Sequence, residues 1–125
     1  MARLAIVQKP PVFLDKAATI AAAAGYVEEA AREGARLVLF PEAYIPGYPA
    51  WIWRLKPGKD WKLSDELYAR LLENSVSLGG EDLAPIQDAA RMHEVTVVCG
   101  VNERDSFHSR ATLYNTAVTI GPGGE

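Results

Sequence analysis

Several signatures of specialised proteins are missing from this sequence. Only one cysteine, Cys99, occurs among the 125 residues, which excludes an internal disulfide framework and fits a reducing cytoplasm. The two histidines, His93 and His108, have no partner at metal-ligand spacing, and no HxH, HExxH or CxxC motif occurs. The sequence therefore indicates no metal site. The serines also lack the G-x-S-x-G pattern of a nucleophile elbow.

Blocks of one charge and long apolar runs are missing as well. The net charge of −3 is mild, so we expect neither a nucleic acid nor an anionic membrane as a partner. No apolar stretch is long enough to span a bilayer, and the first residues do not form a signal peptide. With 49% hydrophobic residues, the composition is that of an ordinary soluble, cytoplasmic protein with one small domain.

The most informative segment present is LVLFPEAYIPGYP, residues 37–49. Its first four residues are all apolar, which is typical of a strand buried on both faces. Pro41 has no N–H to donate to a sheet ladder, so it ends the strand. Glu42 is therefore expected at the carboxyl end of this strand, where active sites of α/β folds collect. On position alone, a capping or ion-paired glutamate explains Glu42 equally well.

The rest of the chain alternates strand and helix patterns. Asp15 and Ser64 are predicted N-caps, because their side chains accept hydrogen bonds from the first turn of a helix. Gly25 falls inside the first helix, although glycine disfavours helix, and we interpret it as a close approach of another element, with simple tolerance of the glycine as the alternative. The expected strands are residues 4–8, 36–40, 95–101 and 111–120, and the expected helices are residues 16–33, 64–77 and 82–93.

Residues 42–63 show no periodicity and contain all three tryptophans. A long aperiodic stretch inside a compact domain is typically functional or disordered. The aromatic content argues against disorder. We therefore expect this segment to carry part of the function.

Residues 37–49 resemble the first catalytic motif of the nitrilase, or carbon–nitrogen hydrolase, family. Further segments resemble the family in the family's own order: residues 4–15, 97–104, 113–116 and 120–124. GYPAWIW, residues 47–53, and GVNERD, residues 100–105, are more similar to true nitrilases than to the amidases or carbamoylases of the family. The chain is thus identified as a member of this family, and we expect it in the true nitrilase branch.

This resemblance implies an α/β fold, the first half of an α-β-β-α sandwich, with a mixed sheet and helices on one face. It implies that residues 1–125 are a partial carbon–nitrogen hydrolase domain, the amino-terminal portion. In the family the other sheet face packs on the equivalent sheet of the second half. A half-molecule would leave that apolar surface bare, as a site for a partner or for aggregation.

The resemblance also implies a Glu–Lys–Cys triad, in which the cysteine attacks the nitrile carbon and the glutamate is the general base. Glu42 matches this glutamate. The lysine and the nucleophilic cysteine of the family would follow Glu125, so the chain carries one member of the triad. Cys99 lies inside an apolar strand without a basic neighbour, and we expect it to be buried and unreactive.

Two aromatic residues after Glu42 are predicted to bind substrate. Tyr48 resembles the tyrosine that lines the family's pocket beside the glutamate, and we expect Glu42 to face a cleft shared with Tyr48. Trp51 is predicted to shape the mouth of this pocket or a contact between subunits. Simple packing explains either side chain as well.

Three polar residues are predicted to support the site. Asn102 and Glu103 end the third strand at the same edge as Glu42, where they would orient Glu42 or cap a loop. Asn115, in a Tyr-Asn-Thr motif, is expected to brace backbone near the site.

The leading hypothesis is an enzyme that hydrolyses a small organic nitrile to a carboxylate and ammonia without a cofactor. Hydrolysis of an amide, or hydrolysis or hydration of cyanide, by the same triad is an alternative. A non-catalytic fragment that acts only with its missing half is another. The resemblance to the family also implies that the full-length enzyme is a homo-oligomer.

Overall fold

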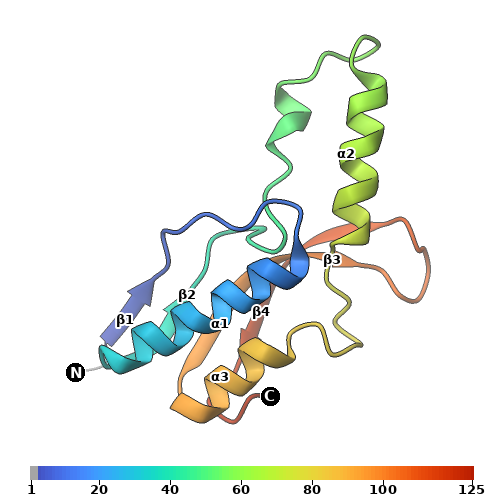
Figure 1. Ribbon diagram of the computed structural model, residues 1–125. Coiled ribbons are helices and arrows are strands. Elements are labelled where there is room, and N and C mark those ends of the chain that lie inside the picture. Colours follow the sequence, from blue (N-terminus) through green and yellow to red (C-terminus); the bar gives the residue numbers. More distant parts are fainter. Residues whose placement is uncertain (1–2) are drawn as a thin grey trace.

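The computed structural model describes residues 3–125 as one four-stranded sheet with helices packed against it (Figure 1). The elements in chain order are β1 (Arg3–Ile6), α1 (Lys16–Arg32), β2 (Ala35–Leu39), the 3₁₀ helix η1 (Ala50–Trp53), α2 (Trp61–Glu73), α3 (Ala84–His93), β3 (Thr96–Arg104) and β4 (Leu113–Ile120). The strands lie in the order β1-β2-β3-β4. The first three are parallel, and β4 is antiparallel to β3, which confirms the expected mixed sheet.

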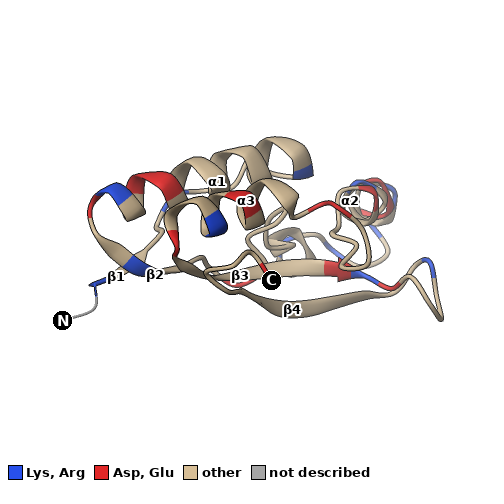
Figure 2. Ribbon diagram, turned by 90° about the horizontal axis from the view of Figure 1, so that it is seen from below, with Lys and Arg blue, Asp and Glu red and all other residues tan. Residues whose placement is uncertain are grey.

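Helices α1 and α3 lie together over one face of the sheet, while none of the helices in residues 3–125 lies on the opposite face (Figure 2). The core fills the space between them. Val38 of β2 and Val97 and Cys99 of β3 meet Ile20 and Ile86 from the helices, all of them buried. The expected fold class is therefore confirmed, with helices on one side only.

The uncovered side of the sheet, here called the open face, is apolar at β1. Side chains alternate along a strand, and Ala5 and Val7 belong to the core, so Leu4 and Ile6 point to the open face. These two side chains are 54% and 65% exposed. Two large apolar side chains exposed side by side on one face of a strand indicate a surface that another layer of structure can cover.

Helix α1 begins where the sequence predicts. The Asp15 carboxylate accepts a hydrogen bond from the Ala18 N–H at 2.9 Å, and Gly34 follows the helix with a φ of 88°. The expected close approach at Gly25 is wrong. Gly25 is exposed and a Cβ there would meet nothing within 4 Å, so this glycine lies on the solvent side of the helix.

Helix α2 starts at Trp61 and not at Ser64, so the predicted cap at Ser64 is wrong. The turn before it is closed by Asp60, whose carboxylate accepts from the Lys56 N–H at 2.8 Å. The helix ends at Glu73 because Val76 pairs with β3. The Val76 N–H donates to the Asn102 carbonyl at 2.8 Å, and its carbonyl accepts from the Arg104 N–H at 2.8 Å.

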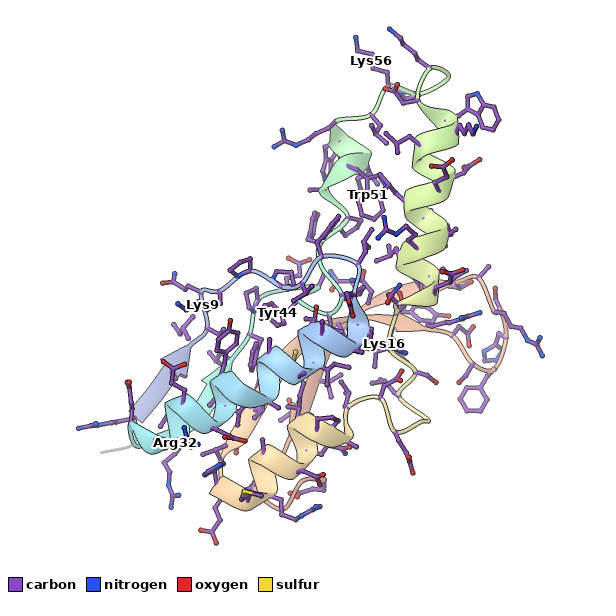
Figure 3. All side chains as sticks on the ribbon, viewed as in Figure 1. Lys9, Lys16, Arg32, Tyr44, Trp51 and Lys56 are labelled. Atoms are coloured by element: carbon purple, nitrogen blue, oxygen red, sulfur yellow. The ribbon has the colours of Figure 1, made fainter. Side chains whose placement is uncertain are left out.

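Together, η1 and α2 form an arm that projects from the two-layer body (Figure 1). Trp51 of η1 lies on the side of α2, as Figure 3 shows, and is buried with Leu14 and Leu71. Its ring meets Phe13 edge-on, with centroids 5.9 Å apart. A second small core thus joins the arm to the loop before α1. None of the helices formed by residues 3–125 has the length and apolar character needed to cross a bilayer.

The linker between α2 and α3 is tied to α1 by an ion pair. The Lys16 ammonium lies 2.9 Å from the Asp82 carboxylate, and both side chains are about three-quarters buried, with exposures of 25% and 24%. The same carboxylate accepts from the Ser77 N–H at 2.8 Å. Asp82 lies in a turn before α3, closed by the Ala84 N–H, which donates to the Glu81 carbonyl at 3.0 Å, so α3 begins at Ala84 and not at the expected residue 82.

We predict that Asp82→Ala lowers the free energy of unfolding by roughly 1–3 kcal/mol, since it leaves the largely buried Lys16 ammonium and the Ser77 N–H without this acceptor. Urea unfolding followed by circular dichroism measures this. Glu28→Ala is the matched control, because it removes the exposed pair with Arg32 within α1. That change is expected to stay within about 0.5 kcal/mol. Equal effects of the two substitutions would contradict the role given to Asp82.

Candidate active site

The chain after β2 leaves the sheet and returns to it within a few residues. The Phe40 N–H donates to the Val98 carbonyl at 2.8 Å, and the Ile45 N–H donates to the Gly100 carbonyl at 3.2 Å. Between these two bonds the chain inserts residues 41–44, while β3 advances only from residue 98 to residue 100. The surplus backbone buckles out of the sheet, and Ala43 takes a left-handed φ of 48°.

This buckle separates two neighbouring side chains. Tyr44 is buried and packs on Phe40, with ring centroids 5.1 Å apart. Glu42 points the other way and is exposed. Its carboxylate accepts a hydrogen bond from the Asn115 side-chain amide at 2.5 Å. Val118, three residues after Asn115 in β4, packs against the core on the helix side, so strand alternation directs Asn115 to the open face. Its hydrogen bond to Glu42 therefore places Glu42 on the open face as well.

Asn102 holds the loop that follows Glu42. Its side-chain amide donates to the Ile45 carbonyl at 3.2 Å and to the Gly47 carbonyl at 3.1 Å. Its backbone N–H donates to the same Ile45 carbonyl at 2.8 Å. Asn102 was expected either to orient Glu42 or to cap a loop, and these contacts support the capping of a loop.

Glu103 lies on the opposite side of β3 from Asn102. Its carboxylate accepts from the Thr116 hydroxyl at 2.7 Å, and Thr116 pairs with the core residue Val101. Strand alternation therefore directs Glu103 toward the helix side of the sheet, away from Glu42. The structure brings Asn115 and Glu42 together and leaves Glu103 out of this group.

No hydrogen bond or ring contact joins Tyr48 or Trp51 to Glu42 within residues 3–125. Tyr48 is 44% exposed. Trp51 is part of the small core of the arm. Within residues 3–125, Glu42 is exposed on the face of the sheet away from α1 and α3 (Figure 2), and the cleft shared with Tyr48 stays a prediction.

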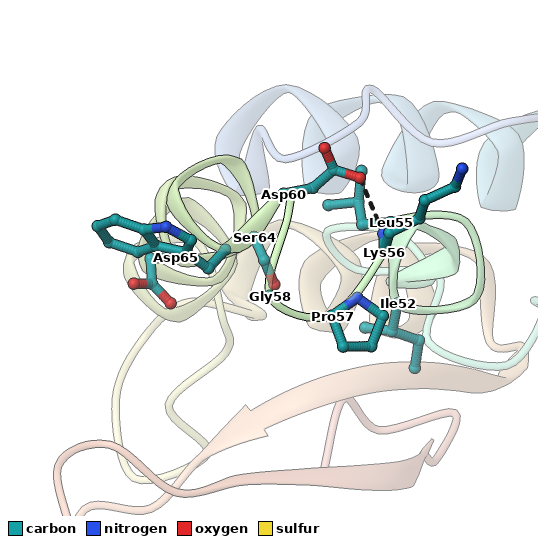
Figure 4. A pocket seen from close by; sticks show the side chains of 9 residues that line it. Ile52, Leu55, Lys56, Pro57, Gly58, Asp60, Ser64 and Asp65 are labelled. Carbon is teal, nitrogen blue, oxygen red and sulfur yellow. Dashed lines mark hydrogen bonds between the residues drawn. The ribbon is translucent and has the colours of Figure 1, made fainter.

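A hollow of about 280 Å³ lies instead in the arm, between η1 and the start of α2 (Figure 4). Leu55, Pro57 and Trp61 line it, and the Lys56–Asp60 hydrogen bond closes one side. Neither Glu42 nor Tyr48 lines this hollow. Within residues 3–125, no three Asp, Glu, His or Cys side chains are grouped so as to hold a metal ion.

Cys99 is placed in the core of the sheet and not at the candidate site. It is fully buried, and burial raises the pKa of its thiol to about 12. A neutral thiol is a poor nucleophile. Burial likewise raises the pKa of the nearby Tyr44 to about 12.

Two residues that shape this region were not singled out from the sequence. Gly100 faces the open side of β3 directly against residues 41–43, and Ala43 carries the left-handed turn beside Glu42. The signal for Gly100 was present, since a glycine inside a strand pattern marks a bulge or a close approach of backbone. No sequence signal marks Ala43, because a left-handed alanine is rare.

Comparison with known proteins agrees with this fold. The model of the carbon–nitrogen hydrolase family matches residues 3–125, and the chain belongs to this family. An arylacetonitrilase from Aspergillus niger is 43% identical over 123 residues, and an aliphatic nitrilase from Rhodococcus rhodochrous is 40% identical over 123 residues. Both alignments cover 98% of the chain but only 34% and 30% of these relatives. The chain therefore spans about a third of the length of the nitrilases it matches.

Solved structures of more distant relatives share the architecture. An amidase from Nesterenkonia sp. superposes with a TM-score of 0.60 at 21% identity, over 99% of this chain and 40% of that one. An N-terminal amidase superposes with a TM-score of 0.62 at 16% identity, over 97% of this chain and 25% of that one. At these identities the likeness establishes the fold.

We predict that Cys99 in the native protein reacts with a thiol reagent at pH 8 far more slowly than in the chain unfolded by guanidinium. The raised pKa keeps the thiol protonated at that pH, and burial blocks access. Absorbance of the released thiolate from an aromatic disulfide reagent follows the rate. Native labelling as fast as that of the unfolded chain would contradict the buried position of Cys99.

Proposed function

We propose that this chain contributes the general base of a nitrile-hydrolysing enzyme of the carbon–nitrogen hydrolase family. The observation that carries the proposal is Glu42 at the end of β2, presented on the open face and held by Asn115, in a chain about 40% identical to nitrilases. A general base needs a carboxylate held in place by rigid elements. Glu42 meets this requirement because β2 and β4 both belong to the sheet.

In the proposed reaction a cysteine thiol adds to the nitrile carbon, and Glu42 passes the thiol proton toward the nitrile nitrogen. The product is a thioimidate. Water then adds at carbon, ammonia leaves, and a second water activated by Glu42 releases the carboxylate and restores the thiol. The cysteine and a lysine are contributed by residues that this chain does not contain, so it acts as a partial domain.

The other predicted residues receive supporting roles. Asn115 orients the Glu42 carboxylate by donating to it, and Asn102 holds the loop at Ile45 and Gly47 so that Tyr48 stays near the same edge. Tyr48, which is exposed, remains available to a substrate once the site is enclosed. The contacts of Trp51 favour packing of the arm over contact with substrate.

We further propose that the open face is covered by the second sheet of the same enzyme. Leu4 and Ile6 support this, because their exposed side chains lie on the same face as Glu42. Covering that face would remove apolar surface from water and enclose the carboxylate at once. The resulting enzyme is expected to be cytoplasmic and to form a homo-oligomer.

We predict that Glu42→Gln, in a longer polypeptide that supplies the lysine and cysteine, lowers kcat for nitrile hydrolysis by roughly 10²–10⁴-fold, since it removes the base while preserving shape. Ammonia release from benzonitrile, an aliphatic nitrile and cyanide measures the loss. An amide assayed in parallel separates nitrilase from amidase activity. Glu66→Gln is the control, because Glu66 is exposed on α2. Near-full activity of Glu42→Gln would refute the proposal.

We predict that the 125-residue chain alone releases no ammonia from these substrates. Nucleophilic catalysis needs the nucleophile and its base in contact, and Cys99 is buried in the core. Adding a separately made polypeptide with the missing lysine and cysteine is expected to restore turnover if it covers the open face. Turnover by the short chain by itself would contradict the proposed division of the triad.

A further inference from the structure

We propose that Gly100 is a positioning residue for the general base. The inference rests on the proposed function of Glu42, although the contact on which it depends is independent of any activity. Gly100 lies in β3 between the core residues Cys99 and Val101, so a side chain at position 100 would point to the open face. The segment that carries Glu42 occupies that space.

The contact between Gly100 and this segment is backbone against backbone. A Cβ built on Gly100 would lie 2.4 Å from the Pro41 carbonyl oxygen, 2.6 Å from the Ala43 nitrogen and 2.7 Å from the Glu42 Cα. These distances are far inside van der Waals contact, and no side-chain rotation relieves them. Any other residue at position 100 must move the Glu42 backbone or break the pairing of β3.

The same segment is held at both ends and has little freedom to move elsewhere. Hydrogen bonds to the Val98 and Gly100 carbonyls hold Phe40 and Ile45, and Ala43 already occupies the left-handed region. A methyl group at position 100 would therefore lift the Glu42 Cα off the sheet. The carboxylate would then leave the reach of the Asn115 amide, to which it is now hydrogen-bonded.

Gly100→Ala in the longer, active polypeptide tests this role. We expect kcat to fall by about 100-fold with KM little changed, because a displacement of about 1 Å in a catalytic group has an effect of this size. Gly25→Ala is the matched control. A Cβ at Gly25 meets nothing within 4 Å, so this variant should keep the parent kcat.

A second readout follows the Glu42–Asn115 contact directly. In ¹H–¹⁵N spectra of the parent, the Asn115 side-chain amide signals are expected to shift upon Glu42→Gln. In Gly100→Ala they should already lie near the positions found in Glu42→Gln, while in Gly25→Ala they should match the parent. Circular dichroism and urea unfolding establish that each variant is folded.

The outcomes separate this inference from the proposed function. Parent-like kcat and Asn115 signals in a folded Gly100→Ala overturn the positioning role, even if Glu42→Gln is inactive. An active Glu42→Gln overturns the proposed function, while the Asn115 signals still report the contact. If Gly100→Ala does not fold, the double variant Gly100→Ala/Ala43→Gly decides, because glycine at the left-handed position 43 lets the Glu42 segment move away from the new methyl group. Ala43→Gly alone is its control. A folded double variant with kcat below that of Ala43→Gly supports the role, and one with the same kcat overturns it.

Discussion

The attachment of residues 40–45 to β3 is the constraint on which the candidate site depends. Hydrogen bonds from Phe40 and Ile45 hold this segment to the Val98 and Gly100 carbonyls. Residues 41–44 lie between these two hydrogen bonds, whereas β3 has one residue between its two carbonyl groups. The extra backbone is therefore forced out of the sheet. The buckle keeps Tyr44 in the core and turns Glu42 to the open face. A regular β2 strand continuing through these positions would not separate the two side chains in this way.

The uncovered sheet links stability and chemistry on one surface. The helices α1 and α3 cover one side, where the core is dense with buried Val, Ile and Ala side chains. The opposite side combines exposed Leu4 and Ile6 with the Glu42–Asn115 pair. An apolar layer placed there would bury hydrophobic area and lower the local dielectric around the carboxylate together. In the function proposed above, assembly and activity would therefore depend on the same face.

Much of the framework follows from local chemistry that the sequence displays. The apolar run before Pro41 predicts β2 and its end, and Asp15 predicts the start of α1 through its side-chain acceptor. The predicted helix boundaries were wrong where a residue near the boundary contacts a residue that is distant in the sequence. Val76 pairs with β3, so α2 ends early. Asp82 contacts Lys16 from the turn that precedes α3, and the helix begins two residues later than expected. Propensity describes a residue and its neighbours, and it contains no information about such partners.

By itself, the sequence determined the strand and helix types, their order, and the position of Glu42 at the end of a buried strand. These properties depend on the period of apolar residues and on the missing N–H of Pro41, which act over a few residues. Only the tertiary structure decided which side chains meet Glu42. Asn115 lies 73 residues away, and the β3–β4 register brings it to the open face while alternation sends Glu103 to the other. Register depends on the folded sheet as a whole, and local sequence does not encode it. A glycine inside a strand pattern signals a close approach, but only the fold shows that residues 41–43 make it at Gly100.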